Sequence, residues 1–103
     1  MAEKNQSNVI IANNLKIDLD RYEAVINGRE LKLARKEYEL LVFLARNAGY
    51  VFNREKIMAA VWGVAVPLKT RTVDVHIRRL RSKMRSAGKY IRALRGVGYK
   101  FKP

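Results

Sequence analysis

The stretch RTVDVHIRRLRSKMR (residues 71–85) decides the fold that we expect for this chain. When it is placed on a helix at about 100° per residue, four apolar side chains fall within one narrow stripe: Val73, Ile77, Leu80 and Met84. We therefore predict a helix that begins near residue 70, fades at residues 87–88 and turns this stripe toward the core.

The opposite face of this predicted helix is strongly basic. The stretch holds six Lys and Arg but a single acid, Asp74, which is also the only acid from Leu68 to the C-terminus. A charge run is usually a solvated surface, but such a surface normally mixes acids and bases one helical turn apart. We interpret this face as one that meets a polyanionic partner.

Small side chains at the centre of the basic face favour a DNA major groove. Val75 and Ser82 would let the helix approach the floor of the groove. Val75 could contact a thymine methyl group, and Arg79 could bridge O6 and N7 of a guanine. The long arginines on either side of this short centre suit a groove better than they suit bulk water.

The charge of the whole chain points the same way. Its 103 residues carry a net charge of +13, and residues 53–103 hold fourteen Lys and Arg against two Asp and Glu. Self-repulsion of this size opposes folding, and a polyanion relieves it. Composition alone leaves DNA, RNA and an anionic membrane open as partners.

Other residue types exclude whole classes of function. The chain has no cysteine and one histidine, so we expect no metal and no cofactor. Without paired carboxylates in its basic half or a phosphate-binding loop, it has no catalytic set, and we predict that it is not an enzyme. Its start is neither a signal peptide nor a membrane span. We expect a flexible leader over residues 1–8 and one domain over residues 9–103.

Two kinds of element are expected before the basic helix. Alternating apolar residues from Leu15 to Leu19, with a hairpin turn at Asn27 and Gly28, predict an antiparallel sheet of three or four strands. A largely apolar helix should follow from residue 34 to about residue 49. A short one should start at Asn53, bury Ile57, Ala60 and Val61, and stop at Gly63.

A second hairpin is expected at the end of the chain. Gly96 and Gly98 allow a tight turn between two short strands, and basic side chains stand on its arms: Arg92, Arg95, Lys100 and Lys102. Such a ribbon fits along a phosphate backbone beside a helix. Phe101 should pack in the core, and Tyr99 should do the same or offer its hydroxyl to a phosphate.

Four segments together resemble the effector domain of OmpR/PhoB-type bacterial response regulators. They are LKLARKEYELLVFLARNAGYVFNREKI (residues 31–57), VWG (61–63), RTVDVHIRRLRSKM (71–84) and IRALRGVGYKF (91–101). The resemblance implies an α+β fold, a winged helix-turn-helix with an N-terminal antiparallel sheet, three helices and a C-terminal hairpin wing. It implies transcription regulation, with a recognition helix (70–86) in the major groove of DNA and the wing (90–102) at the adjacent minor groove.

The resemblance also implies roles for single residues. Base-reading positions would be Val75, Arg78, Arg79 and, in the minor groove, Arg95. Residues at or near phosphates would be Arg54, Trp62, Arg71, Thr72, His76 and Arg81. Trp62 has packing as its alternative, and His76 a local hydrogen bond.

Partners are implied in the same way. Family members bind direct-repeat half-sites head to tail, some touch RNA polymerase, and a receiver domain normally precedes the effector domain. This chain is too short to hold a receiver, so we expect either a fragment of a two-component regulator or a stand-alone relative, and we favour the fragment. We expect it to act in the bacterial cytoplasm at the nucleoid.

The chain departs from the family pattern at three places. Ala34 stands where the family usually has Ser or Thr, and Ala93 where it usually has Thr. The loop GVAVPLK (63–69) has no acid, whereas in relatives this loop is often acidic and touches RNA polymerase. The main alternative function is a protein-interaction module that uses the same basic face. RNA binding is disfavoured because this face has no exposed aromatic residue at its centre.

Overall fold

The computed structural model describes residues 8–63 and 69–103. The predicted leader therefore falls almost wholly outside the described residues, as does most of the loop before the basic helix. The elements in chain order are β1 (Val9–Ala12), β2 (Leu15–Asp18), β3 (Glu23–Ile26), β4 (Arg29–Glu30), α1 (Arg35–Arg46), α2 (Arg54–Val61), α3 (Arg71–Met84), the 3-10 helix η1 (Arg85–Tyr90), β5 (Ile91–Leu94) and β6 (Gly98–Phe101).

The first four strands form the predicted antiparallel sheet, in the order β1-β2-β3-β4. Leu15 and Ile17 of β2 are fully buried, whereas Lys16 between them is exposed, as the alternating pattern predicted. Asn27 and Gly28 link β3 to β4 with φ angles of 52° and 78°. A two-residue hairpin turn of this kind needs positive φ at both positions, and Asn-Gly tolerates it best.

Helix α1 starts without the side-chain cap that the family usually provides. Ala34 has no acceptor, but its backbone N–H donates to Glu37 Oε1 over 2.8 Å. One half of a capping box therefore remains. The helix ends at Asn47, whose side-chain amide donates to the carbonyl of Phe43 over 2.7 Å. The helix starts within one residue of the predicted position but ends three residues before the expected residue 49.

Helix α2 begins as predicted, because Asn53 Oδ1 accepts the N–H of Lys56 over 2.8 Å. The prediction of its buried face was wrong at one position. Ala60 is exposed and Met58 is buried beside Ile57 and Val61. In so short a helix, the larger apolar area of the methionine side chain sets which face turns inward.

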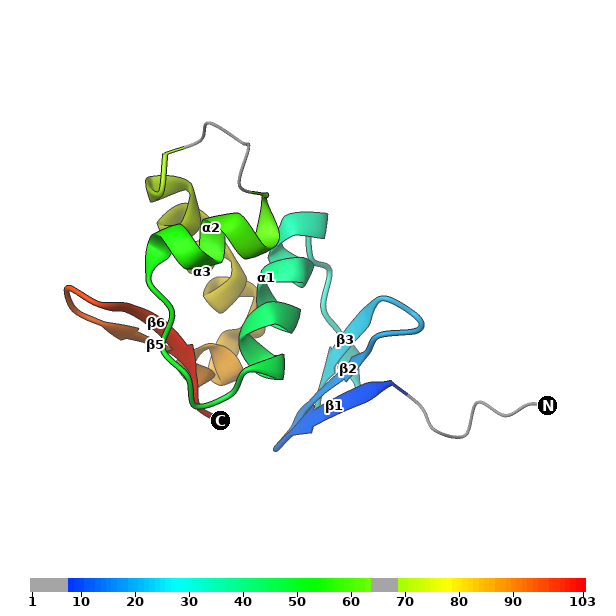
Figure 1. The fold of residues 1–103 in the computed structure, drawn as a ribbon. Coiled ribbons are helices and arrows are strands. Elements are labelled where there is room, and N and C mark those ends of the chain that lie inside the picture. Colours follow the sequence, from blue (N-terminus) through cyan, green and yellow to red (C-terminus); the bar gives the residue numbers. More distant parts are fainter. Residues whose placement is uncertain (1–7, 64–68) are drawn as a thin grey trace.

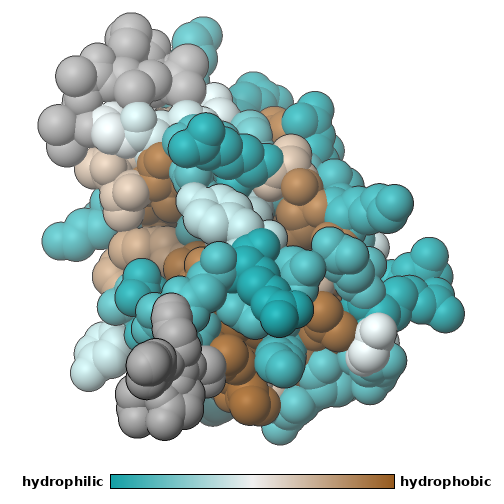
Figure 2. Space-filling view, turned by 90° about the vertical axis from the view of Figure 1, so that its right-hand side faces the viewer, coloured by the Kyte–Doolittle hydropathy of each residue, from teal (hydrophilic) through white to brown (hydrophobic). Residues whose placement is uncertain are grey.

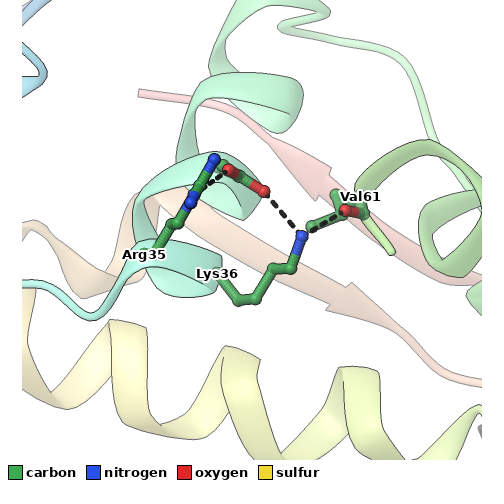
Figure 3. Close-up of polar contacts among 4 residues, drawn as sticks. Arg35, Lys36 and Val61 are labelled. Carbon is green, nitrogen blue, oxygen red and sulfur yellow. Dashed lines mark hydrogen bonds and ion pairs between the residues drawn. The ribbon is translucent and has the colours of Figure 1, made fainter. Parts of the chain in front are cut away.

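A lysine ties α1 to the end of α2. Lys36 Nζ donates to the carbonyl of Val61 over 3.0 Å and to Glu39 Oε1 over 3.0 Å, and Arg35 Nε reaches the other oxygen of Glu39 (Figure 3). The last carbonyls of a helix lack partners within the helix, so the lysine satisfies one of them.

Helix α3 buries the predicted stripe completely. Val73, Leu80 and Met84 are 0% exposed and Ile77 is 2% exposed. The helix is shorter than the expected 70–86, since Arg85 takes a φ of 52° and the chain continues as η1. A left-handed residue cannot extend an α-helix. Gly88 lies in η1 so close to Arg81 that a Cβ atom there would be 2.5 Å from the Arg81 carbonyl oxygen.

The sheet and the β5–β6 hairpin lie on opposite sides of the helices (Figure 1). One core joins the inner face of the sheet, the three helices and the base of the hairpin. From the side of the sheet, hydrophobic areas are separate patches among hydrophilic ones (Figure 2). No helix within residues 8–63 and 69–103 has the length and apolar character needed to cross a membrane.

Candidate nucleic-acid interface

The face of α3 opposite the buried stripe presents its arginines to solvent. Arg71, Arg78, Arg79 and Arg81 are all exposed. Val75 lies among them and is partly buried, so its side chain protrudes less than those of the arginines. The burial of the apolar stripe fixes this outcome, because residues on the far side of the helix cannot also reach the core.

Three of the predicted backbone contacts cluster where α2 meets α3. His76 Nδ1 lies 2.8 Å from the carbonyl oxygen of Thr72, and the Trp62 ring meets the His76 ring edge-on with centroids 4.9 Å apart. Thr72, Trp62 and His76 are all partly buried. The alternatives to a phosphate contact are therefore seen for both residues: Trp62 packs against the core, and His76 makes a local hydrogen bond.

A second cluster joins α2, α3 and β6 through Asp74. Arg54 Nε donates to both oxygens of this carboxylate, over 2.8 Å to Oδ1 and 3.0 Å to Oδ2. The Tyr99 hydroxyl donates to Oδ1 over 2.5 Å. The Arg54 guanidinium also stands over the Tyr99 ring, with its Cζ 6.0 Å from the ring centre, within reach of a cation–π interaction.

The ionisation of this cluster follows from its contacts. Burial raises the pKa of Asp74, but hydrogen bonds from Tyr99 and Arg54 outweigh burial, so the net pKa is lowered. Burial and the neighbouring carboxylate both raise the pKa of the Tyr99 hydroxyl. At neutral pH Asp74 is thus an anion and Tyr99 a neutral donor already engaged with it.

The wing is anchored to the segment before α2. Phe52 and Tyr99 exchange backbone hydrogen bonds of 2.9 and 3.0 Å, and the N–H of Gly49 donates to the carbonyl of Phe101 over 2.9 Å. A Cβ atom on Gly98 would lie 2.0 Å from the Phe52 carbonyl oxygen. Glycine at position 98 therefore serves a close backbone approach, a reason that the sequence did not reveal.

The tip of the wing is open to solvent. Arg95 and Val97 are exposed in the turn between β5 and β6, as are Arg92 and Lys102 along the hairpin. A hollow lies where α3 meets the wing, lined by Asp74, Ile77, Arg78 and Arg81 of α3 and by Tyr99 of β6. Two exposed arginines of α3, Arg78 and Arg81, therefore lie next to the wing.

The predicted residues thus form three groups. One is the exposed arginine row of α3 with Val75, one is Trp62 with Thr72 and His76, and one is Arg54 with Tyr99. Arg95 stands apart at the wing tip. Sequence reasoning missed Asp74, which joins the third group, although its position as the lone acid in a basic region was a usable signal. Among residues 8–63 and 69–103, no group of side chains could hold a metal ion.

Comparison with known proteins identifies the family. Residues 28–101 match the family model described as "Transcriptional regulatory protein, C terminal". The response regulator ArlR of Staphylococcus haemolyticus is 44% identical over 96 residues, which are 91% of this chain and 44% of ArlR. ArlR of Staphylococcus aureus strain Mu50 is 41% identical over the same shares. The chain thus spans less than half the length of these relatives.

Solved structures share the fold. DrrB, an OmpR/PhoB homologue of Thermotoga maritima, superposes with a TM-score of 0.84 at 36% identity, over 92% of this chain and 44% of DrrB. The DNA-binding domain of Klebsiella pneumoniae RstA, solved in complex with the RstA box, gives a TM-score of 0.84 at 29% identity over 93% of this chain and 98% of that domain.

A third solved structure is the DNA-binding domain of the response regulator AdeR in complex with an intercistronic region, with a TM-score of 0.80 at 29% identity over 90% of this chain and 97% of that domain. These matches confirm the predicted fold class. They also agree with the expectation that the chain is not an enzyme, because the matched family consists of transcription regulators. The chain belongs to the family of C-terminal domains of transcriptional regulatory proteins, as the winged helix of an OmpR/PhoB-type response regulator.

Proposed function

We propose that this chain binds double-stranded DNA in a sequence-specific manner and thereby regulates transcription. In this proposal α3 enters the major groove and the wing reaches the adjacent minor groove. The observation that carries it is the division of α3 into two faces. Its apolar stripe is 0–2% exposed, while its arginines are exposed and two of them, Arg78 and Arg81, lie next to the wing. The DNA complexes of the AdeR and RstA domains, which share this fold, support the same function.

The residue roles follow the three groups at the interface. Val75, Arg78 and Arg79 would read bases, and Arg95 would enter the minor groove. Arg71, Thr72 and Arg81 would bind phosphates along α3, with Trp62, His76 and Arg54 at the α2 side. The Tyr99 hydroxyl would have to give up its hydrogen bond to Asp74 in order to reach a phosphate. We therefore assign Tyr99 a structural role within the protein.

The assembly on DNA and the further partners belong to the same proposal. We expect direct-repeat half-sites about one helical turn apart, bound by copies arranged head to tail. A receiver domain would accompany this domain in the full-length regulator, in the bacterial cytoplasm at the nucleoid. A contact with RNA polymerase would need chemistry other than the acidic loop of relatives, because residues 63–69 hold no acid.

Selection of bound duplexes from a random pool tests this function. We expect the selected sequences to share a repeated half-site, and their affinity to exceed that of random DNA by about 10³-fold or more at physiological salt. Affinity for random DNA should fall steeply with salt, because phosphate contacts release counterions. Equal affinity for selected and random duplexes would instead favour the protein-interaction module.

A further inference from the structure

We propose that Asp74 is a positioning residue that aims the Arg54 guanidinium at a backbone phosphate of DNA, and that Tyr99 holds Asp74 in place. This inference rests on the proposed function, because it assigns the arrangement of one of its phosphate contacts. It gives a role to the only acid between Leu68 and the C-terminus.

The hydrogen bonds of Arg54 leave one edge of its guanidinium free. Nε alone is used by Asp74, and within the described residues neither Nη group donates a hydrogen bond to a protein acceptor. The side chain is 42% exposed. A guanidinium carries five N–H donors in a planar fork that matches the oxygens of a phosphate. With Nε fixed on the protein, the four N–H groups of the Nη edge remain for an anion outside.

Asp74 is itself fixed from two other elements. Its Oδ1 accepts the Tyr99 hydroxyl from β6, and its backbone belongs to the first turn of α3. Tyr99 is in turn held by backbone hydrogen bonds to Phe52, one residue before Asn53, which caps the helix of Arg54. Helix α2, helix α3 and strand β6 therefore each contribute one side chain to the cluster. A long side chain that is ordered in advance loses less conformational freedom when it binds.

Simple electrostatics predicts the opposite effect for Asp74. An acid on a surface that meets DNA repels phosphates, so removing it should raise the affinity for any duplex. Positioning predicts that removing it lowers the affinity, because the Arg54 fork is no longer held. The sign of the effect therefore separates a positioning carboxylate from an incidental one.

The test compares two substitutions that remove the same charge. Asp74→Asn keeps the shape of the side chain but weakens its bonds to Arg54 and Tyr99. Glu55→Gln removes an exposed acid next to Arg54 in sequence, which makes no ion pair within the described residues. Binding of a random-sequence duplex is measured against salt concentration.

We expect Asp74→Asn to bind several-fold more weakly than the unmodified chain. The slope of log K against log salt should become shallower by up to about 0.9, the loss of one phosphate contact. Glu55→Gln should bind at least as tightly as the unmodified chain. Equal or tighter binding by Asp74→Asn would overturn the inference. If the unmodified chain shows no salt-dependent duplex binding, the proposed function fails instead.

A double-substitution cycle tests whether Asp74 acts through Arg54. In an Arg54→Ala background, Asp74→Asn should cause no further loss, and the same loss in both backgrounds would overturn the proposal. Tyr99→Phe keeps the ring in the core and should cause a smaller loss that also disappears in Arg54→Ala. If Asp74→Asn does not fold, as judged by thermal melting, the Tyr99→Phe comparison in the two backgrounds decides the question alone. A Tyr99→Phe variant that retains Arg54 and binds with unchanged affinity would then overturn the proposal.

Discussion

Lys83 of α3 reaches back to Glu37 at the start of α1, with its Nζ 2.7 Å from Oε1 of a carboxylate whose side chain is 3% exposed. The same oxygen accepts the N–H of Ala34 over 2.8 Å. One buried carboxylate thus caps α1 and fixes α3 against it. The position of the basic helix depends on a contact that lies away from its exposed face.

Loss of Lys83 should destabilise the fold. Lys83→Met keeps the length of the side chain but leaves the Glu37 carboxylate buried with a single donor. An unpaired buried charge is costly, so we expect a loss of about 1–3 kcal/mol in the free energy of unfolding, measured in urea. Lys89→Met is the matched control, because Lys89 is exposed and makes no ion pair within residues 8–63 and 69–103. Equal losses in the two variants would contradict a role for the pair.

The stability of the chain should fall in acid partly through Glu37. Burial raises the pKa of Glu37, but hydrogen bonds from Lys83 and from the Ala34 N–H outweigh burial, and the net pKa lies below the ordinary 4.5. A folded pKa below the unfolded one contributes stability that is fully present above pH 4.5 and is lost as the pH falls through the folded value. Asp74, whose pKa is also lowered, acts in the same direction.

The Glu37→Gln variant separates the contribution of Glu37 to the loss of stability in acid from that of Asp74. Glu37→Gln should be less stable than the unmodified chain at pH 7, and this difference should shrink as the pH falls below 4.5, because the unmodified chain then loses the same charge. Urea unfolding at a series of pH values measures it. A difference that stays constant with pH would show that the charge of Glu37 is not responsible.

A side-chain cap at position 34 should stabilise α1. Ala34 has φ −67° and ψ 158°, the extended conformation of a residue that precedes a helix, and Glu37 already provides the reciprocal half of a capping box. Ala34→Ser should therefore raise the free energy of unfolding by about 1 kcal/mol. Ala48→Ser, an exposed change beyond the end of the helix, should have little effect. No gain from Ala34→Ser would mean that the hydroxyl does not reach the free N–H.

Substitution of Gly98 should loosen the wing. An alanine Cβ there would lie 2.0 Å from the Phe52 carbonyl oxygen, so the backbone pairing between the wing and residue 52 must shift. Overpacking of this kind costs about 1–3 kcal/mol, occasionally more. Gly96→Ala is the comparison, because nothing lies within 4 Å of its Cβ position although its φ is 76°. Thermal melting should show the larger loss for Gly98→Ala.

The sequence predicted those parts of the fold that local rules determine. Alternation at Leu15 and Ile17, the Asn27–Gly28 turn, the Asn53 cap and the buried stripe of α3 each depend on residues close together in the chain. The boundary of α3 was one exception. A helix normally continues through an arginine, and the positive φ of Arg85 ends it there.

Contacts between distant residues could not be predicted in this way. Arg54 and Asp74 are 20 residues apart, and Tyr99 and Asp74 are 25 apart. Nothing in the periodicity of α2 or β6 indicates that they meet. The close approach of Gly98 to Phe52 is equally nonlocal, so the sequence indicated a turn glycine but not its reason. Which arginines face outward was predictable because the apolar stripe fixed the rotation of α3.

Base reading by Arg79 is the prediction on which sequence specificity depends most. Arg79 is exposed on α3 and takes part in no hydrogen bond or ion pair within the described residues, so its guanidinium is available for O6 and N7 of a guanine. Arg79→Ala should lose about 1–3 kcal/mol on the selected half-site and much less on random DNA, measured by titration at one fixed salt concentration. Arg71→Ala, at a position in the same helix that we propose to contact a phosphate, should weaken both duplexes by similar factors. If Arg79→Ala also weakened both equally, Arg79 would bind the backbone, and specificity would have to come from Val75, Arg78 or the wing.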